Sequence, residues 1–185
     1  MSQYCTYVLD HPTHKSYHDC EYGFPKTDET ALFELLVLEI NQAGLSWDLM
    51  LKKRETMRAA YDGFHVDKVA AYGEADTARL LEDSGIIRNR LKIAAAIHNA
   101  KVLQTMRDSH GGFSGWLMTH HPLRRKDWTK LFKKIFKFTG GEIVNEFLMS
   151  TGYLPFAHGE DCPIGQNFTD APWQKVGEEF YQDEM

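Results

Sequence analysis

The sequence has few cysteines and no long apolar run. Its 185 residues include only three cysteines, at positions 5, 20 and 162. A scattered, odd-numbered set argues against a disulfide framework and leaves metal ligation as the most informative use of these residues. No stretch approaches the roughly 18 apolar residues that suggest a membrane helix, and the first residues lack the basic and apolar regions of a signal peptide. We therefore expect a soluble protein of the cytoplasm, a reducing compartment, with no membrane partner.

Repeats, low-complexity tracts and obvious linkers are also lacking, and strand-like alternation is confined to residues 5–9 (CTYVL). Helical periodicity covers most of the remaining chain. Thr27 or Asp28 is placed to cap a helix that ends at Gly44. The length suits one body that buries its own core. We expect a mainly α fold in which residues 1–185 form a single two-lobed helical domain.

The net charge of −5 discourages binding of nucleic acid by the surface as a whole. The distribution matters more than the sum, because one basic face can bind phosphate while the rest is acidic. Residues 124–137 carry seven basic side chains and one acid, and residues 51–58 and 87–92 form smaller basic groups. Ordinary solvated helix faces have the same composition, so charge alone leaves both interpretations open.

One carboxyl group occurs where the helical pattern calls for an apolar side chain. On the helix predicted over residues 29–43, Glu34 and Asn41 share a polar strip, whereas Glu39 lies about 140° from Glu34 among leucines. A buried carboxyl is costly unless it is hydrogen-bonded, and burial raises its pKa. Glu39 is therefore either a core acid bonded to an arginine or a loop amide, or a group that faces a pocket. In the second case Trp47 would form an apolar wall.

Cysteine and histidine gather near the two ends of the chain. Twelve residues separate Cys5 from His18, and three separate His158 from Cys162. Thiolate and imidazole are ligands that zinc favours, and four of them close a tetrahedral site. One interpretation is a structural zinc that joins the chain ends and leaves no position open for water. The spacing alone also permits unrelated surface or core residues.

Residues 80–97 (LLEDSGIIRNRLKIAAAI) contain a turn with glycine between two predicted helices. Backbone N–H groups of such a turn, together with a helix N-terminus, can bind phosphate. This is the physical basis of a helix-hairpin-helix contact with DNA. An ordinary corner between two helices has the same pattern, so the segment by itself permits either.

Together these segments resemble the DNA-3-methyladenine glycosylase I family of base-excision repair enzymes. The resemblance is carried by YHDCEYGFP, LFELLVLEINQAGLSWDLMLKKRE, DSGIIRNRLKI, FKFTGG and the Cys5, His18, His158 and Cys162 set, and it covers about residues 4–165. It implies a helix-hairpin-helix glycosylase fold in which those four residues bind one structural Zn²⁺ ion.

The resemblance also implies how the chain is divided. The helix-hairpin-helix lies around residues 76–108, and the zinc joins residues 1–25 to residues 150–168. The tail, residues 169–185, is either disordered or folded back through its aromatic residues. We expect a monomer.

The implied activity is removal of 3-methyladenine from double-stranded DNA. The enzyme would flip the alkylated base and hydrolyse its glycosidic bond, leaving an abasic site. Glu39 would accept hydrogen bonds from the base, Tyr17 would contact it, Trp47 would stack on it, and Leu45 would fill the gap in the duplex. A final group, Ser84, Gly85, Ile86, Ile87 and Arg88, would grip the DNA backbone.

The chain departs from the family pattern at several positions. Tyr7 and Tyr22 stand where the family has tryptophan around the base, and Leu91 replaces a hairpin glycine. Smaller aromatic side chains in the pocket wall would admit bulkier alkyl adducts. Alternatively, the departures would mark a zinc-stapled helical module that binds damaged DNA without releasing a base. A hydrolase that uses Cys20 and His18 is disfavoured, because neighbours two apart rarely reach the geometry of a catalytic pair.

Overall fold

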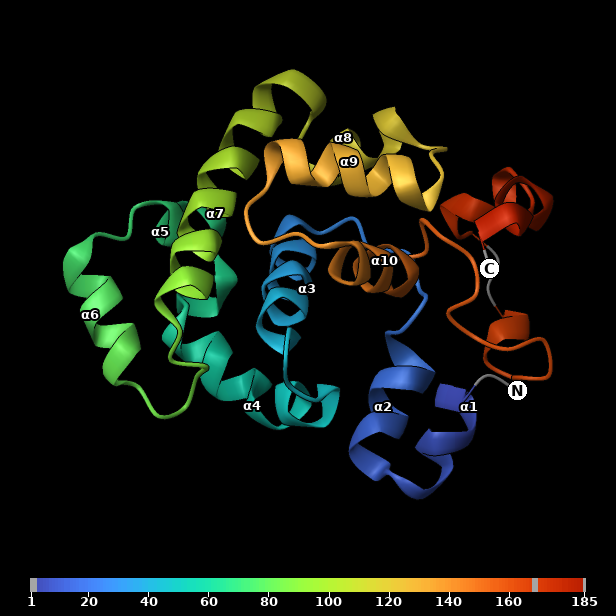
Figure 1. Cartoon of the computed structure of the whole chain (residues 1–185), viewed down its shortest axis with the longest axis horizontal. Coiled ribbons are helices and arrows are strands. Elements are labelled where there is room, and N and C mark those ends of the chain that lie inside the picture. Colours follow the sequence, from blue (N-terminus) through green and yellow to red (C-terminus); the bar gives the residue numbers. More distant parts are fainter. Residues whose placement is uncertain (1–2, 168–169, 185) are drawn as a thin grey trace.

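The computed structural model describes residues 3–167 and 170–184, and these ranges are built of helices (Figure 1). The α-helices are α1 (Gln3–Tyr7), α2 (Pro12–Cys20), α3 (Glu29–Gln42), α4 (Trp47–Ala60), α5 (Val66–Ala70), α6 (Glu74–Glu82), α7 (Arg90–His110), α8 (Phe113–His120), α9 (Arg125–Ile135) and α10 (Gly141–Ser150). Short 3-10 helices are η1 (Val8–Asp10), η2 (Asp62–Phe64), η3 (Gly165–Asn167), η4 (Pro172–Lys175) and η5 (Glu178–Glu184). The mainly α prediction is confirmed. The strand-like alternation at residues 5–9 forms no strand, because these residues lie in α1 and η1.

Helix α3 runs through the middle of the molecule, with α4 to α7 on one side and α2 and α10 on the other (Figure 1). It begins where the sequence predicts, since the Asp28 side chain accepts a hydrogen bond from the Ala31 N–H at 2.8 Å. All of residues 32–41 are buried. The polar strip expected on this helix therefore does not face water, and its polar side chains must find partners inside the protein.

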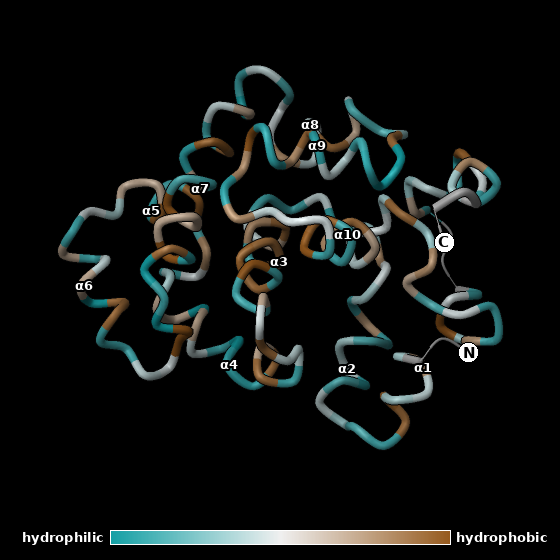
Figure 2. The backbone as a smooth tube through the Cα atoms, viewed as in Figure 1, coloured by the Kyte–Doolittle hydropathy of each residue, from teal (hydrophilic) through white to brown (hydrophobic). Residues whose placement is uncertain are grey.

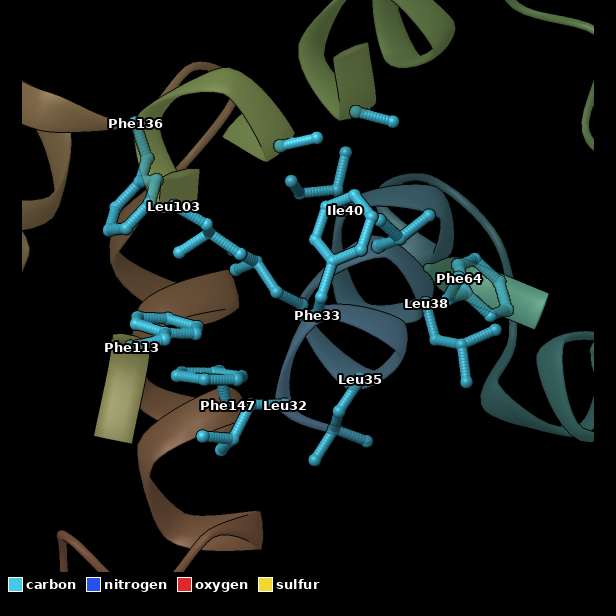
Figure 3. Close-up of a cluster of buried hydrophobic side chains, with 14 of the residues drawn as sticks. Leu32, Phe33, Leu35, Leu38, Ile40, Phe64, Leu103, Phe113, Phe136 and Phe147 are labelled. Carbon is cyan, nitrogen blue, oxygen red and sulfur yellow. The ribbon is translucent and has the colours of Figure 1, made fainter. Parts of the chain in front are cut away.

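The core forms where apolar side chains from several helices meet around α3. Figure 2 shows hydrophobic residues concentrated on α3 and on the inner turns of its neighbours. In Figure 3, the rings of Phe113 and Phe147 lie parallel beside Leu32, with centroids 5.6 Å apart. Phe33 meets Phe64 edge to face at 6.3 Å. Helices α8 and α10 are thus packed on one flank of α3, and η2 on another.

Glu34 joins α3 to α4 through an ion-pair network. Its side chain is 6% exposed and accepts hydrogen bonds from Arg54 Nε at 2.6 Å and from Arg58 Nη2 at 2.9 Å. Arg54 also donates to both carboxylate oxygens of Glu21, at 2.7 and 2.8 Å. Paired guanidinium and carboxylate groups satisfy a charge that would otherwise be costly to bury.

Lys92, near the start of α7, holds the end of α3. Its ammonium group is buried and donates to the carbonyl oxygens of Asn41 at 2.7 Å and Ala43 at 2.8 Å. The chain then turns at Gly44, whose φ of +80° lies in the left-handed region. Ser46 caps α4 by accepting from the Leu49 N–H at 3.3 Å. This short turn lies beside the pocket described below.

The described part of the tail, residues 170–184, lies against the body of the protein. Trp173 and Phe180 are partly buried on the core. Tyr181 is 1% exposed and its hydroxyl is hydrogen-bonded to His121 Nε2 at 3.1 Å. Thr169 and Met185 lie outside the described residues. Within those described, no helix is both long and apolar enough to cross a membrane.

Replacing Glu34 by glutamine is expected to lower the free energy of unfolding by about 3 kcal/mol, because it removes one partner of a buried pair. For a chain of this size that corresponds to a fall in Tm of about 6–12 °C. The matched control is Glu55→Gln, which removes a carboxylate that is 80% exposed and 3.6 Å from Arg58. Thermal unfolding should show almost no change for the control, and equal losses in both variants would contradict a dominant role for the buried pair.

Candidate active site and metal centre

A pocket of about 250 Å³ lies beside the second half of α3. It is smaller than the ~300–1,000 Å³ of sites for drug-sized ligands, so it suits a small occupant. Five separate parts of the chain contribute to its walls. The lining residues are Tyr4, Tyr17, Tyr22, Glu39, Gln42, Trp47 and Glu146. The structure therefore brings together four residues that the sequence singled out, Tyr17, Tyr22, Glu39 and Trp47.

Aromatic rings form most of the pocket wall. The Tyr17 ring lies 5.2 Å from that of Trp47 and 5.7 Å from that of Tyr22. The Tyr17 hydroxyl and the Trp47 Nε1 atom are buried and have no hydrogen-bond partner in the described structure. Burial raises the pKa of Tyr17 well above its usual value, with the nearby Glu39 carboxyl adding to the effect. The pocket thus offers a stacking surface together with unsatisfied polar groups.

Glu39 projects from α3 into this aromatic space. It is 3% exposed, and its Oε2 atom has no hydrogen-bond partner among the described residues. Burial, and secondly the charge of Glu146, raise the pKa of Glu39 well above its usual value. Glu34, five residues earlier, meets two arginines, so the contrast between the two acids is local and specific. Of the two sequence interpretations, a group that faces a pocket matches this geometry.

Glu146 is a second acid in the pocket, and it was not among the site residues predicted from the sequence. It lies on α10, and the Tyr22 hydroxyl donates to its Oε2 atom at 3.2 Å. Burial raises the pKa of Glu146, and the hydrogen bond from Tyr22 opposes that rise. The usable sequence signal was the one that identified Glu39, an acid flanked by Val144 and Phe147 in an apolar helix.

Tyr7, which was expected in the wall, is not among the lining residues. Its side chain is 43% exposed, and its ring stacks on His11 at 3.7 Å. Tyr4, one turn earlier in α1, lines the pocket instead and is hydrogen-bonded to His14 Nδ1 at 3.3 Å. The Tyr7 ring also meets His14 edge to face at 5.0 Å, so it packs on the start of α2.

A second hollow of about 330 Å³ adjoins the first and shares Glu39, Gln42 and Glu146 with it. The turn between α3 and α4 forms part of its wall. Leu45 lies on this turn with its side chain 41% exposed. An apolar side chain is thus held at the mouth of the pocket by a turn whose backbone Lys92 anchors.

The predicted hairpin lies between α6 and α7 and is held by α4. Lys53 Nζ donates to the Ser84 carbonyl at 2.8 Å, and Thr56 Oγ1 donates to the Gly85 carbonyl at 2.7 Å. A Cβ atom on Gly85 would lie 3.0 Å from Thr56 Cβ, so only glycine allows this close approach. Ile86 is 3% exposed and anchors the hairpin in the core.

The outer part of the hairpin faces solvent. Ile87 is half-buried, whereas Arg88 is exposed. Leu91, which replaces a family glycine, is 69% exposed, so its side chain does not disturb the packing. The Asn89 side chain caps α7 by accepting from the N–H groups of Leu91 at 3.0 Å and Lys92 at 3.2 Å. The hairpin thus presents a basic side chain beside a well-formed helix start.

The four predicted metal ligands converge on one point. The ligand atoms of Cys5, His18, His158 and Cys162 all lie within 4.8 Å of one another. The four separations between a cysteine sulfur and a histidine nitrogen lie between 3.4 and 3.9 Å. Bonds of about 2.3 Å to sulfur and about 2.0–2.1 Å to nitrogen at a tetrahedral angle place such atoms about 3.5 Å apart. The cluster can therefore bind a metal ion, and it joins the two end segments of the chain.

The outer nitrogen of each histidine ring also has a partner. His18 Nδ1 lies 2.7 Å from Asp19 Oδ1, and His158 Nε2 donates to the Tyr22 carbonyl at 2.9 Å. Such contacts orient imidazole rings, and here the other ring nitrogen of each histidine lies toward the cysteine sulfurs, where it can ligate. Because the Tyr22 ring lines the pocket, the metal cluster and the pocket wall are one contact apart.

The chain matches the family model for methyladenine glycosylase over residues 7–130. It is 38% identical over 169 residues to DNA-3-methyladenine glycosylase 1 of Escherichia coli (strain K12), which covers 81% of this chain and 90% of that protein. DNA-3-methyladenine glycosylase of Haemophilus influenzae (strain ATCC 51907 / DSM 11121 / KW20 / Rd) is 32% identical over 182 residues, covering 88% and 98%.

The fold is also similar to a solved structure of 3-methyladenine DNA glycosylase I from Staphylococcus aureus that concerns recognition of 3-methyladenine. The TM-score is 0.80 at 31% identity, with 89% of this chain and 97% of that chain covered. Sequence and fold agree over most of the length, and so this chain belongs to the methyladenine glycosylase family.

Proposed function

We propose that this protein removes 3-methyladenine from DNA by hydrolysing the N-glycosyl bond. The observation that carries the proposal is the unpartnered Glu39 carboxyl beside Trp47 and Tyr17, in a small pocket of a methyladenine glycosylase family member. Flipping a base costs a few kcal/mol, and weakly paired alkylated bases cost least. Stacking on an aromatic side chain returns about 1–3 kcal/mol.

Each pocket residue then has a distinct role. Glu39 accepts hydrogen bonds from the flipped base, Trp47 stacks on it, and Tyr17 contacts it from the side. Tyr22 closes the wall, and Tyr4 takes the position that the sequence assigned to Tyr7. N3-alkylated adenine carries positive charge, which an electron-rich indole face attracts.

The chemistry needs little acid catalysis, because a cationic base is already a good leaving group. A water molecule attacks the sugar carbon as the bond to the base breaks, and the DNA strand stays intact. An amine nucleophile is not required. Lys92, the buried lysine near the Leu45 turn, has its ammonium group held by two carbonyls and is not placed to attack.

DNA binds across the turn and the hairpin. Leu45 fills the space that the flipped base leaves, and its exposed position at the pocket mouth suits that role. The hairpin of Ser84, Gly85, Ile86, Ile87 and Arg88 grips the DNA backbone, with the exposed Arg88 charge facing the phosphates and the buried Ile86 holding the hairpin in place. Lys53 and Thr56 support the hairpin from α4.

The metal cluster holds one structural Zn²⁺ ion in this proposal. Two thiolates and two imidazoles close a tetrahedral site, so the ion joins chain segments and takes no part in the hydrolysis. The protein acts as a monomeric, two-lobed single domain in the cytoplasm, where DNA is found and cysteine stays reduced. The pocket and the helix-hairpin-helix lie in this one body.

Glu39→Gln is expected to lower the rate of base release by about 10²-fold, because the amide presents one accepting oxygen and one donating NH2 group where the carboxylate presents two accepting oxygens. Release of free 3-methyladenine from methylated DNA measures the effect. Release by the wild type is the test of the function itself. Its absence, with tight binding of the lesion, would support the non-catalytic module instead.

The stability of Glu39→Gln relative to the wild type should increase as the pH rises. The folded-state pKa of Glu39 is raised above the usual value of 4.5, so the folded protein binds this proton more tightly than the unfolded chain. Its contribution to stability is fully present below pH 4.5 and falls as the pH rises toward the folded pKa. Thermal unfolding should show the Tm of Glu39→Gln rising relative to the wild type between pH 4.5 and 8. A constant difference would contradict the burial of this carboxyl.

Trp47→Ala is expected to lose about 1–3 kcal/mol of base binding, a fall of roughly 5-fold to 150-fold in kcat/KM, because the stacking surface is gone. Trp47→Phe keeps an aromatic face and serves as the matched control. Single-turnover base release measures both variants. Equal activity of the alanine and phenylalanine variants would rule out stacking as the role of this side chain.

Removing the metal with a chelator should lower Tm and loosen the pocket wall, since His158 supports the Tyr22 backbone. Metal content by mass spectrometry and Tm are measured before and after treatment. Restored Tm on adding Zn²⁺ is the expected result. A chelated protein with unchanged Tm would contradict a structural ion.

A further inference from the structure

Two carboxyl groups from different helices share the space at the pocket. Glu39 of α3 and Glu146 of α10 both line the pocket and the adjoining hollow at Leu45. Glu39 is 3% exposed with an unpartnered oxygen, whereas Glu146 accepts a hydrogen bond from the Tyr22 hydroxyl at 3.2 Å. The two acids therefore occupy one site in unequal surroundings.

These surroundings act differently on the pKa of Glu39 and the pKa of Glu146. Burial and the charge of Glu146 both raise the pKa of Glu39, well above its usual value. Burial also raises the pKa of Glu146, and so does the charge of Glu142, but hydrogen bonds from Tyr22 and Asn145 and the charge of Arg125 oppose that rise. Glu146 thus has donors and a cation nearby that favour its charged form, whereas no such group lowers the pKa of Glu39.

Glu146 also differs from the other acid on its helix. Glu142, one turn earlier, is 85% exposed and pairs with Arg125 at 2.6 Å. Glu146 is instead partly buried and is held by Tyr22, whose own backbone carbonyl is bound by His158. A side chain fixed in this way keeps its charge at a defined place in the pocket.

We propose that Glu146 is a specificity-determining residue, the anion that makes this pocket favour N-alkylated purines that carry a positive charge. Glu39 reads the hydrogen-bonding edge of the base, and Glu146 responds to its charge. The inference rests on the proposed glycosylase function. Beside buried side chains such as Tyr17 and Tyr22, attraction between opposite charges exceeds its value in bulk solvent, and an uncharged base of the same shape gains nothing from it.

The first test compares base release by the wild type, Glu146→Gln and the control Glu55→Gln, which neutralises an exposed carboxylate outside the pocket. The Glu146→Gln substitution is expected to lower kcat/KM for cationic 3-methyladenine in DNA by about tenfold, through loss of one charge interaction. Affinity for a duplex with the uncharged isostere 3-deaza-3-methyladenine should not change. If Glu146 had only a structural role, the substitution would weaken recognition of the cationic base and of the isostere alike. That result, or an unchanged kcat/KM for cationic 3-methyladenine, would overturn the proposal.

The second test measures recognition of the charge without turnover, and it adds Glu146→Asp as a variant that keeps the charge. Because Glu39→Gln is expected to release base slowly, its DNA affinity can be measured without turnover. Three proteins are compared: Glu39→Gln alone, Glu39→Gln with Glu146→Asp, which keeps the charge, and Glu39→Gln with Glu146→Gln, which removes it. The preference for the cationic duplex over the isostere should persist in Glu39→Gln and in its combination with Glu146→Asp, and fall about tenfold in its combination with Glu146→Gln. An equal preference in all three proteins overturns the proposal.

The two proposals fail in different ways. Absence of 3-methyladenine release by the wild type would remove the glycosylase function. Normal release by the wild type, together with an unchanged charge preference in the proteins that carry Glu146→Gln, would remove only the role of Glu146. Tm values of every variant, measured alongside, separate folding defects from changes in recognition.

Discussion

Burial of α3 on nearly every side is the constraint from which the other features follow. A helix in that position can keep a polar side chain only if a partner satisfies it or a site uses it. Glu34 meets two arginines, and the Asn41 side chain donates to the Val37 carbonyl at 2.7 Å. Glu39 alone among these three has a buried oxygen without a partner. Burying the Glu39 carboxyl costs free energy, and a cationic base bound in the pocket would lower that cost.

Two sets of contacts hold the walls of the pocket in place around the Glu39 carboxyl. Lys92 binds the last carbonyls of α3 and so ties the hairpin helix to the turn that carries Leu45. The Cys/His cluster draws together α1, α2 and the segment after α10, and its His158 supports the backbone of Tyr22. Residues far apart in sequence thus line a single hollow, because separate anchors hold each wall in place.

Much of the site could be inferred from the sequence because its signals are local. An acid within an apolar helix identified Glu39, and Trp47 follows it closely along the chain. Tyr4 and Glu146 were missed for different reasons. Tyr4 and Tyr7 are both tyrosines of one short helix, and only the packing of their rings, Tyr4 in the pocket wall and Tyr7 on His11, separates them. Glu146 lies far from Glu39 along the chain, and no spacing rule connects α10 with α3.

The helical class, a cap for α3 at Thr27 or Asp28, and a ligand set whose chemistry suits a metal can all be predicted from the linear chain. Capping and periodicity depend on neighbours a few residues apart, so they can be recognised without the fold. The sharing of one pocket by two acids and the burial of the expected polar strip of α3 appear only once the chain is folded. Those outcomes depend on which helices pack together, and packing is decided by contacts between residues distant in sequence.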